Sequence, residues 1–317
     1  MKKLKKIKII FAGNEKFSKE HLNELILNNL NVITIFTKPD KRSGRGKKIK
    51  FSKVKKLAIK KKIKFLQPKN LNSKKTFNYI KNINPDIMII VSYGLIIPKK
   101  IIKIFPLGCI NIHTSLLPKF RGPSPIQSVI LLGKKKTGIT IIQINKKIDE
   151  GDILYQKKIL INKKDTYKSL KKKLCFEGKK CLILCLKKII KNKIIKIKQD
   201  NKKSTYTKKI KKKDGLINWN NSASTIEKKI RAFNPWPGTF FFIKKIMIKI
   251  WKAEIIKLKK KIKPGIIFKV NKNGIIISTK KNFINIKEIQ ISGKKKNKVN
   301  IILNAYKNLF NLNKKLN

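Results

Sequence analysis

The chain has 317 residues, of which 82 are Lys or Arg and 15 are Asp or Glu, so its formal net charge is +67. This length allows two domains and a substantial core. No apolar stretch approaches the ~20 residues that span a membrane, and residues 1–6 lead straight into a predicted strand rather than a signal peptide. Both observations argue against a membrane protein and predict a protein of the cytoplasm.

The excess of basic residues has two sources. Lys, Ile and Asn recur throughout the chain because their codons are rich in A and T, and we expect this bias to account for most of the Lys. A field of this strength also attracts RNA of any sequence, because neutralised phosphates release counterions. Arg is kept at few positions, which indicates sites that need a planar, forked donor. These are Arg42, Arg45, Arg121 and Arg231.

The first half of the chain alternates predicted strands and helices. Strands are predicted at 7–12, 32–36, 64–66 and 86–91, and another enters Asn111. Helices are predicted at 17–29, 52–62 and 73–83. This alternation predicts an α/β domain with a doubly wound, parallel, Rossmann-like sheet, whose ligands gather at the carboxyl ends of the strands. Gly13 lacks a GxGxxG context and does not indicate a dinucleotide site.

The pattern changes after a helix predicted at 166–190. A highly basic, weakly apolar segment at 191–207 indicates a linker. Beyond it, short apolar segments punctuated by Gly and Pro predict a small, OB-like β-barrel. Its strands are predicted at 238–250, 265–270, 274–278 and 283–291, with one helix at 223–233. We therefore divide the chain into 1–190, 191–207 and 208–317.

Three polar residues point to acyl transfer. Asn111 and His113 alternate at a predicted strand end, so their side chains share one face, and the apolar run at 137–144 brings Asp149 from the adjacent strand. A carboxamide can donate to a developing oxyanion, an imidazole can move a proton, and a carboxylate can fix the tautomer of that imidazole. No side-chain nucleophile is needed when the acceptor supplies an amine.

The other histidine and the cysteines do not predict a site. His21 lies in a charged helical pattern and is interpreted as a solvent-exposed residue. The cysteines form no CxxC pair, so we expect buried free thiols and no metal site. They are Cys109, Cys175, Cys181 and Cys185.

Six motifs follow one another along nearly the whole chain. They lie at 11–13, 36–48, 92–98, 111–127, 148–152 and 231–237. In this order they resemble the methionyl-tRNA formyltransferases. The segments around Asn111, His113 and Asp149 are shared by the transferases that use 10-formyltetrahydrofolate, whereas 36–48 and 231–237 narrow the resemblance to the tRNA enzymes. The chain departs from the family at Asn14-Glu15, where Thr-Pro is usual, and at Lys147, where Gly is usual.

The resemblance implies a two-domain transferase that moves the formyl group of 10-formyltetrahydrofolate, a co-substrate, to the α-amine of methionine on initiator tRNA. The catalytic domain is then 1–190 and the tRNA-binding domain 208–317. We assign Asn111 and protonated His113 to stabilising the oxyanion, His113 also to proton transfer, and Asp149 to orienting His113. Two loops resemble the folate-contacting loops of the family, with the residues Ser92, Tyr93, Gly94, Leu95, Ser115, Leu116, Leu117 and Pro118. We expect a monomer without a metal.

The basic loop at 37–48 is the segment we expect to contact tRNA. It combines one Pro, two Gly, two Arg and four Lys, and a long loop without structure of its own is usually functional or disordered. Guanidinium groups can pair bidentately with phosphates or base edges. The residues assigned to tRNA binding are Arg42, Arg45, Lys47 and Lys48.

Other functions remain as alternatives. A formyltransferase acting on glycinamide ribonucleotide or a sugar nucleotide would keep Asn111, His113 and Asp149, and a formyltetrahydrofolate hydrolase would use water as the acceptor. The β-rich C-terminal part argues against both. A non-catalytic RNA-binding protein derived from the enzyme would have lost its site to the drift that shaped the surface, yet the three residues are present.

Overall fold

The computed structural model describes residues 2–43 and 48–316. The described chain divides into two compact units. The α/β unit comprises the residues up to Gly122, together with Lys136–Leu160 and Lys171–Thr207. The β unit comprises Pro123–Lys135, Ile161–Leu170 and the residues from Lys208 onwards. Two short segments from the middle of the sequence therefore pack with the C-terminal part of the chain.

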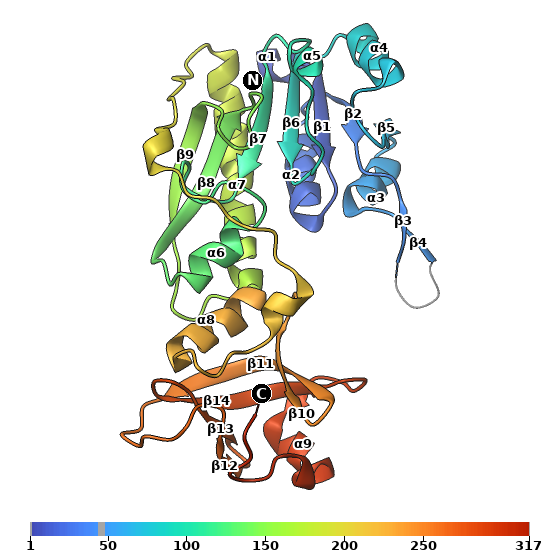
Figure 1. Ribbon diagram of the computed structural model, residues 1–317. Helices are drawn as coiled ribbons and strands as arrows, with labels where there is room; N and C mark the ends of the chain where they lie inside the picture. The colour runs from blue at the N-terminus through green and yellow to red at the C-terminus, as the bar shows by residue number, and fades with distance from the viewer. Residues whose placement is uncertain (1, 44–47, 317) are drawn as a thin grey trace. The chain divides into compact units, whose positions relative to one another are not determined.

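The α/β unit is built on a seven-stranded sheet of order β5-β2-β1-β6-β7-β8-β9 (Figure 1). The strands are β1 (Ile9–Gly13), β2 (Val32–Phe36), β5 (Phe65–Leu66), β6 (Ile87–Val91), β7 (Cys109–His113), β8 (Lys136–Gln143) and β9 (Ile153–Leu160). The five strands from β5 to β7 pair in parallel, whereas β8 and β9 are antiparallel to their neighbours. The predicted Rossmann-like sheet is confirmed. The edge strand β9 was not predicted, because its alternation is broken by the consecutive Lys157 and Lys158.

Helices precede, connect and follow the strands of this sheet. They are α1 (Lys2–Lys6), α2 (Lys16–Leu27), α3 (Lys53–Lys60), α4 (Lys74–Ile83), α5 (Lys99–Ile102) and most of α7 (Tyr167–Ile190). The side chains of Ser52 and Ser73 cap α3 and α4 by accepting from the backbone N–H three residues on. Ile80 of α4 and Ile101 of α5 share one apolar cluster with Ile10 of the sheet. This packing fixes the sheet edge at which the parallel strands end.

The β unit is an antiparallel sheet around an Ile-rich core, and the predicted small barrel domain is confirmed. Its strands are β10 (Thr239–Ile243), β11 (Ile246–Ile256), β12 (Ile267–Asn271), β13 (Gly274–Ser278), β14 (Phe283–Ile291) and β15 (Asn297–Lys298), in the order β10-β11-β14-β13-β12 with β15 beside β14. Buried and half-buried residues alternate along β10, as a strand with one face on the core requires. The unit also contains α6 (Pro125–Leu131), α8 (Ala223–Phe233) and α9 (Val299–Ala305).

The basic loop at 37–48 has structure at its ends, so the expectation of a loop without structure of its own is wrong there. The strands β3 (Lys41–Ser43) and β4 (Lys48–Lys50) pair in an antiparallel ladder. The two strands pair through their backbones. Their Lys-rich sequence shows no alternation of apolar and polar residues, so it did not predict strands. No helix among the described residues has the length and apolarity needed to cross a bilayer.

His21 is fully buried, so its interpretation as a solvent-exposed residue is wrong. It lies on the face of α2 that also buries Phe17, Leu22 and Leu25. Its Nδ1 lies 2.8 Å from the carbonyl oxygen of Phe17, and because a carbonyl only accepts, Nδ1 carries the proton. Burial lowers the pKa of His21 from 6.5 to about 4, although the hydrogen bond to Phe17 partly opposes the shift.

This buried histidine predicts acid sensitivity. In the unfolded chain His21 takes up a proton near its ordinary pKa of 6.5, whereas the folded chain does so only near pH 4. Its contribution to stability is therefore complete above pH 6.5 and is lost as the pH falls towards 4, by up to ~3 kcal/mol. Urea unfolding at pH 7.0, 5.5 and 4.5 measures this slope. We expect His21→Asn to remove it and His113→Asn, which deletes the other histidine, to keep it; equal slopes in both variants would contradict the assignment.

Candidate functional site

The site lies where β7 ends beside the turn that joins β8 to β9. Asn111 and His113 alternate along β7, and the antiparallel ladder sets them opposite residues of β8. The turn then delivers Asp149, whose backbone φ of 55° lies in the left-handed region. Gly151 makes this turn possible, because a Cβ atom there would lie 1.7 Å from the carbonyl oxygen of Gln143. The ladder and the tight turn together bring distant residues to one place.

The Asp149 carboxylate contacts both side chains of β7. Asn111 Nδ2 donates to Oδ1 at 3.4 Å, and His113 Nδ1 lies 3.5 Å from Oδ2. The backbone N–H of Gly122 also donates to Oδ2, at 2.8 Å. The side chains of His113 and Asp149 are 7% and 12% exposed, so these interactions are only weakly screened by solvent. The structure therefore brings the three predicted residues together, while their catalytic roles stay a prediction.

His113 lies between two acceptors. Its Nε2 is 2.9 Å from the carbonyl oxygen of Phe120, on the side opposite Asp149. Since a carbonyl and a carboxylate both accept, an imidazolium can donate on both sides. This partner was missed by the sequence analysis, because a backbone carbonyl leaves no signal in residue type.

The first predicted folate loop, Ser115–Pro118, is half inside the protein. Ser115 and Leu117 are buried, and Leu116 and Pro118 are half-buried. Thr140 and Gln156 hold this loop: Thr140 Oγ1 donates to Ser115 O at 2.6 Å, and Gln156 Nε2 donates to Leu117 O at 2.9 Å. The surface that this loop offers a ligand is therefore mainly the apolar Leu116 and Pro118.

The second predicted folate loop follows β6. Ser92 and Gly94 are exposed, Leu95 is half-buried and Tyr93 is buried. Burial raises the pKa of the Tyr93 phenol well above its usual range. Ser92 and Gly94 both have positive φ, of 48° and 73°. The loop thus turns sharply and presents backbone rather than large side chains.

Asn14, where the chain departs from the family pattern, joins this loop to the loop that follows β2. Its Nδ2 donates to the carbonyl oxygen of Tyr93 at 2.7 Å, and its Oδ1 accepts from the backbone N–H of Lys38 at 2.7 Å. A Cβ atom on Gly94 would lie 2.7 Å from the Nζ of Lys38. Asn14 therefore bridges two loops at the ends of β2 and β6.

Two of the four residues predicted to bind tRNA lie in the β3–β4 ladder. Arg42 pairs through its backbone with Ile49, and Lys48 pairs with Ser43. Arg45 and Lys47 lie outside the described residues. The structure therefore places the backbone of two of these residues and leaves their roles as predictions.

The base of this hairpin is fixed by Asp40. Lys55 Nζ and Gln67 Nε2 both donate to its carboxylate, and Gln67 Nε2 also donates to the carbonyl oxygen of Lys38 at 2.7 Å. Burial would raise the pKa of Asp40, but the hydrogen bonds from Lys55 and Gln67 outweigh it and lower that pKa. The basic hairpin therefore rises from a fixed base.

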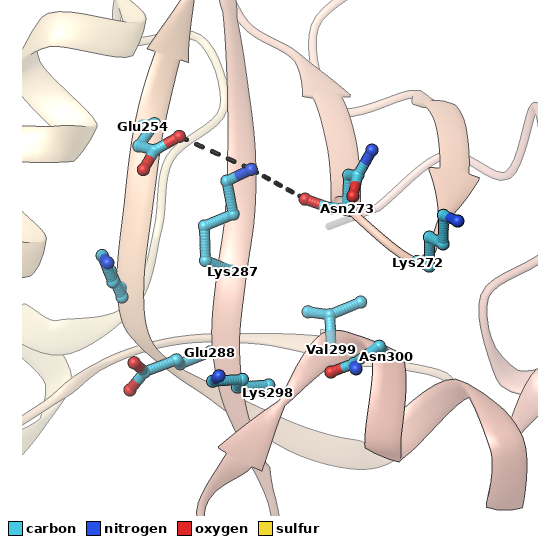
Figure 2. Close-up of a pocket in the computed structure, with 9 residues that line it drawn as sticks. Glu254, Lys272, Asn273, Lys287, Glu288, Lys298, Val299 and Asn300 are labelled. Atoms are coloured by element: carbon cyan, nitrogen blue, oxygen red, sulfur yellow. Dashed lines mark hydrogen bonds and ion pairs between the residues drawn. The ribbon is translucent and has the colours of Figure 1, made fainter.

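The β unit has a cavity of its own, of about 320 Å³ (Figure 2). Its lining side chains are mostly charged, and they include Lys252, Lys272, Lys287 and Lys298 beside Glu254 and Glu288. Lys287 Nζ donates to the carbonyl oxygen of Asn273 at 2.8 Å and lies 3.5 Å from Glu254. Asn111, His113 and Asp149 do not line this cavity.

Comparison with known families decides what kind of protein carries this site. Residues 5–186 match the family described as "Formyl transferase", and residues 209–307 match "Formyl transferase, C-terminal domain". The chain belongs to the formyl transferase family. It is 48% identical to a methionyl-tRNA formyltransferase from Buchnera aphidicola subsp. Acyrthosiphon pisum, over 98% of this chain and 99% of that one. It is 45% identical to a methionyl-tRNA formyltransferase from Wigglesworthia glossinidia brevipalpis, over 98% of each chain.

Solved structures share the fold of this chain. A sugar 3N-formyl transferase, WlaRD, whose structure was solved in the presence of dTDP and 5-N-formyl-THF, is 25% identical and has a TM-score of 0.65 over 91% of this chain and 99% of that one. HypX from Aquifex aeolicus, solved in complex with tetrahydrofolic acid, is 14% identical and has a TM-score of 0.63 over 94% of this chain and 46% of that one. The second likeness shows the fold alone.

The contacts of Asp149 lead to a prediction for Asp149→Asn. The amide keeps the size of the side chain and can still accept from the Gly122 N–H, but it removes the negative charge beside His113. We expect formyl transfer to slow by about a hundredfold or more, with the KM for the folate substrate within about threefold. Steady-state kinetics on the purified variant measure both values. A variant that loses only folate affinity would instead make Asp149 a folate ligand.

Proposed function

We propose that this chain transfers the formyl group of 10-formyltetrahydrofolate to the α-amine of methionine on initiator tRNA. The observation that carries the proposal is the likeness, over nearly the full length of both chains, to relatives named methionyl-tRNA formyltransferase. The identities of 48% and 45% to these relatives, against 25% to a sugar formyltransferase, favour the tRNA substrate. The contacts among Asn111, His113 and Asp149 support the same reaction class.

The site chemistry suits an acceptor that is itself a nucleophile. The amine of an aminoacyl ester needs to be positioned against the formyl carbon rather than activated by a serine or cysteine. We propose that Asn111 and protonated His113 donate to the charge that develops on the formyl oxygen. His113 also passes a proton to the departing folate nitrogen, for which its ring must exchange the carbonyl of Phe120 for the substrate. Asp149 orients the ring and supports its charge.

The two loops predicted to bind the folate fit its chemistry. When bound, 10-formyltetrahydrofolate supplies an activated formyl group on a flat, polar-edged ring system. The half-buried Leu95, Leu116 and Pro118 can form apolar walls, and the exposed backbone of Ser92 and Gly94 can pair with polar ring edges. We propose that these loops hold the folate and that Asn14 keeps the second loop in place.

We further propose that residues 1–190 form the catalytic domain, 191–207 the linker and 208–317 the tRNA-binding domain. The lysines around the cavity of the β unit support phosphate contacts there, and Arg42, Arg45, Lys47 and Lys48 support contacts from the hairpin. One chain carries all three side chains of the site, which supports a monomer. The tRNA substrate belongs to translation, which supports work in the cytoplasm.

Incubation of the purified chain with methionyl initiator tRNA and 10-formyltetrahydrofolate tests the function. We expect N-formylmethionine after alkaline release from the tRNA, detected by mass spectrometry. His113→Ala should abolish transfer while circular dichroism and tRNA binding stay unchanged, because the imidazole acts only at the reacting groups. Transfer to a dTDP-linked amino sugar, or formate release with no formylated tRNA, would replace this proposal with one of the alternatives.

The basic hairpin allows specific and nonspecific electrostatics to be separated. If Arg42 recognises the acceptor end of initiator tRNA, Arg42→Ala should reduce transfer to that tRNA at least about tenfold more than transfer to a poor tRNA substrate. Replacing the exposed Lys202 and Lys203 by Ala should weaken all tRNAs alike and flatten the salt dependence. Rates with two tRNAs at two salt concentrations measure this. Equal losses on both tRNAs for Arg42→Ala would leave the hairpin as solvated charge.

A further inference from the structure

Arg121 is the largest fully buried side chain of the protein among the residues that the structure describes. A buried guanidinium is costly unless its N–H groups are paired. Nε and Nη2 donate to Gln199 Oε1 at 3.2 and 2.8 Å, and Nη2 also donates to Asn201 Oδ1 at 2.8 Å. Nη1 donates to Tyr206 Oη at 3.1 Å and lies 3.3 Å from Glu150 Oε1. These approaches match the five N–H donors of the group.

The residues on either side of Arg121 contact the two central side chains of the site. The carbonyl oxygen of Phe120 lies 2.9 Å from His113 Nε2. The N–H of Gly122 donates to Asp149 Oδ2 at 2.8 Å. The position of the Arg121 backbone therefore fixes two groups. One is the Phe120 carbonyl that faces Nε2 of His113, and the other is the Gly122 N–H that donates to Asp149.

The same cluster holds the turn that carries Asp149. Gln199 Nε2 donates to the carbonyl oxygens of Asp149 and Gly151, at 2.8 and 2.7 Å, while its oxygen accepts from Arg121. Glu150 Oε1 accepts from Tyr206 Oη at 3.2 Å. We call Arg121, Glu150, Gln199, Asn201 and Tyr206 the clamp. The clamp links the segment 120–122 to the turn that carries Asp149, and His113 contacts both of these segments.

Backbone hydrogen bonds also join Arg121 to the segment predicted as a linker. Arg121 N donates to Thr205 O at 2.8 Å, and Thr207 N donates to Arg121 O at 2.8 Å, which makes a parallel bridge. Phe120 N donates to Thr205 Oγ1 at 2.8 Å. Residues 199–207 thus form one side of the structure that supports the site.

We propose that Arg121 is a positioning residue for formyl transfer and that the segment 199–207 of the proposed linker holds Arg121 in place. This inference rests on the proposed function of the site. Arg121 does not touch the reacting atoms. It acts by fixing the Phe120 carbonyl and the Gly122 N–H, and through Gln199 the Asp149 turn, so that the imidazole and the carboxylate meet in one orientation. A Lys cannot replace it, because an ammonium has no fork to reach Gln199, Asn201 and Glu150 together.

Three variants separate positioning from stability. Arg121→Lys keeps the charge and removes the fork. Gln199→Glu keeps an acceptor for Arg121 but cannot donate to the carbonyl oxygens of the Asp149 turn, and its side chain is only half-buried. Arg231→Lys is the matched control, because Arg231, in the β unit, also donates to a carboxylate, that of Glu227, and to a carbonyl, that of Asp165.

We expect Arg121→Lys and Gln199→Glu each to lower kcat at least about tenfold, with the KM for either substrate within twofold, and to shift the pH–rate profile. We expect Arg231→Lys to lower Tm without changing kcat per folded molecule or the pH profile. A lower Tm for the two clamp variants with an unchanged kcat and pH profile would overturn the proposal and leave the clamp as structure alone.

A readout independent of activity comes from the two histidines. Long-range ¹H–¹⁵N spectra report the tautomer and charge of each ring, and the buried His21 serves as an internal reference. In both clamp variants the His113 signals should move and the His21 signals should stay. If the unmodified chain fails to formylate methionyl-tRNA, the proposed function fails, yet these spectra still test the clamp. Unchanged His113 signals in Arg121→Lys and Gln199→Glu would refute it directly.

Discussion

The carboxylate of Asp149 is the group on which the arrangement of the site depends. Its Oδ1 accepts from Asn111, and its Oδ2 accepts from the Gly122 N–H and faces His113. These partners come from β7 and from the segment beyond it, so one carboxylate joins both to the turn between β8 and β9. The left-handed backbone of Asp149 costs about 1–2 kcal/mol, a cost similar to what one hydrogen bond to a charged group contributes. The turn is therefore stable only while its partners hold it, so fold and site depend on each other.

The buried Arg121 and the half-buried Arg231 explain why drift towards Lys stopped at these positions. Arg121 reaches acceptors in several directions from one plane, and Arg231 donates from two nitrogens to Glu227 and from a third to the carbonyl oxygen of Asp165. An ammonium at either position would leave acceptors without a donor inside the protein, which costs more than losing the hydrogen bond itself. The retained Arg thus marks a geometric need, and at these two positions the need is internal to the fold rather than set by a nucleic acid.

Sequence patterns predicted the sheet, the barrel and the meeting of Asn111, His113 and Asp149, because the positions of strands and helices and the alternation of side chains along a strand follow from apolar periodicity. They failed where structure depends on other signals. His21 shares a helix face with Phe17 and Leu25 at spacings of four residues, but its charged neighbours hid that face. The β3–β4 ladder has no apolar alternation to detect. Contacts such as that of Gln199 with Arg121 join polar residues far apart in the chain, and no local pattern encodes them.

The basic segment of the clamp is held by contacts that salt and RNA do not weaken. A chain of +67 repels itself, and a polyanion relieves this repulsion, yet phosphates also compete for exposed ion pairs. Residues 199–207 are held within the α/β unit by backbone pairs and by amide and hydroxyl groups that meet Arg121, with Glu150 as the acidic partner of Arg121. Because Arg121 is fully buried, salt and phosphates have little access to these contacts. The exposed Lys202 can therefore meet a nucleic acid, and Lys203 can do so by exchanging its exposed ion pair with Asp200, while the groups that position the site are kept apart from that competition.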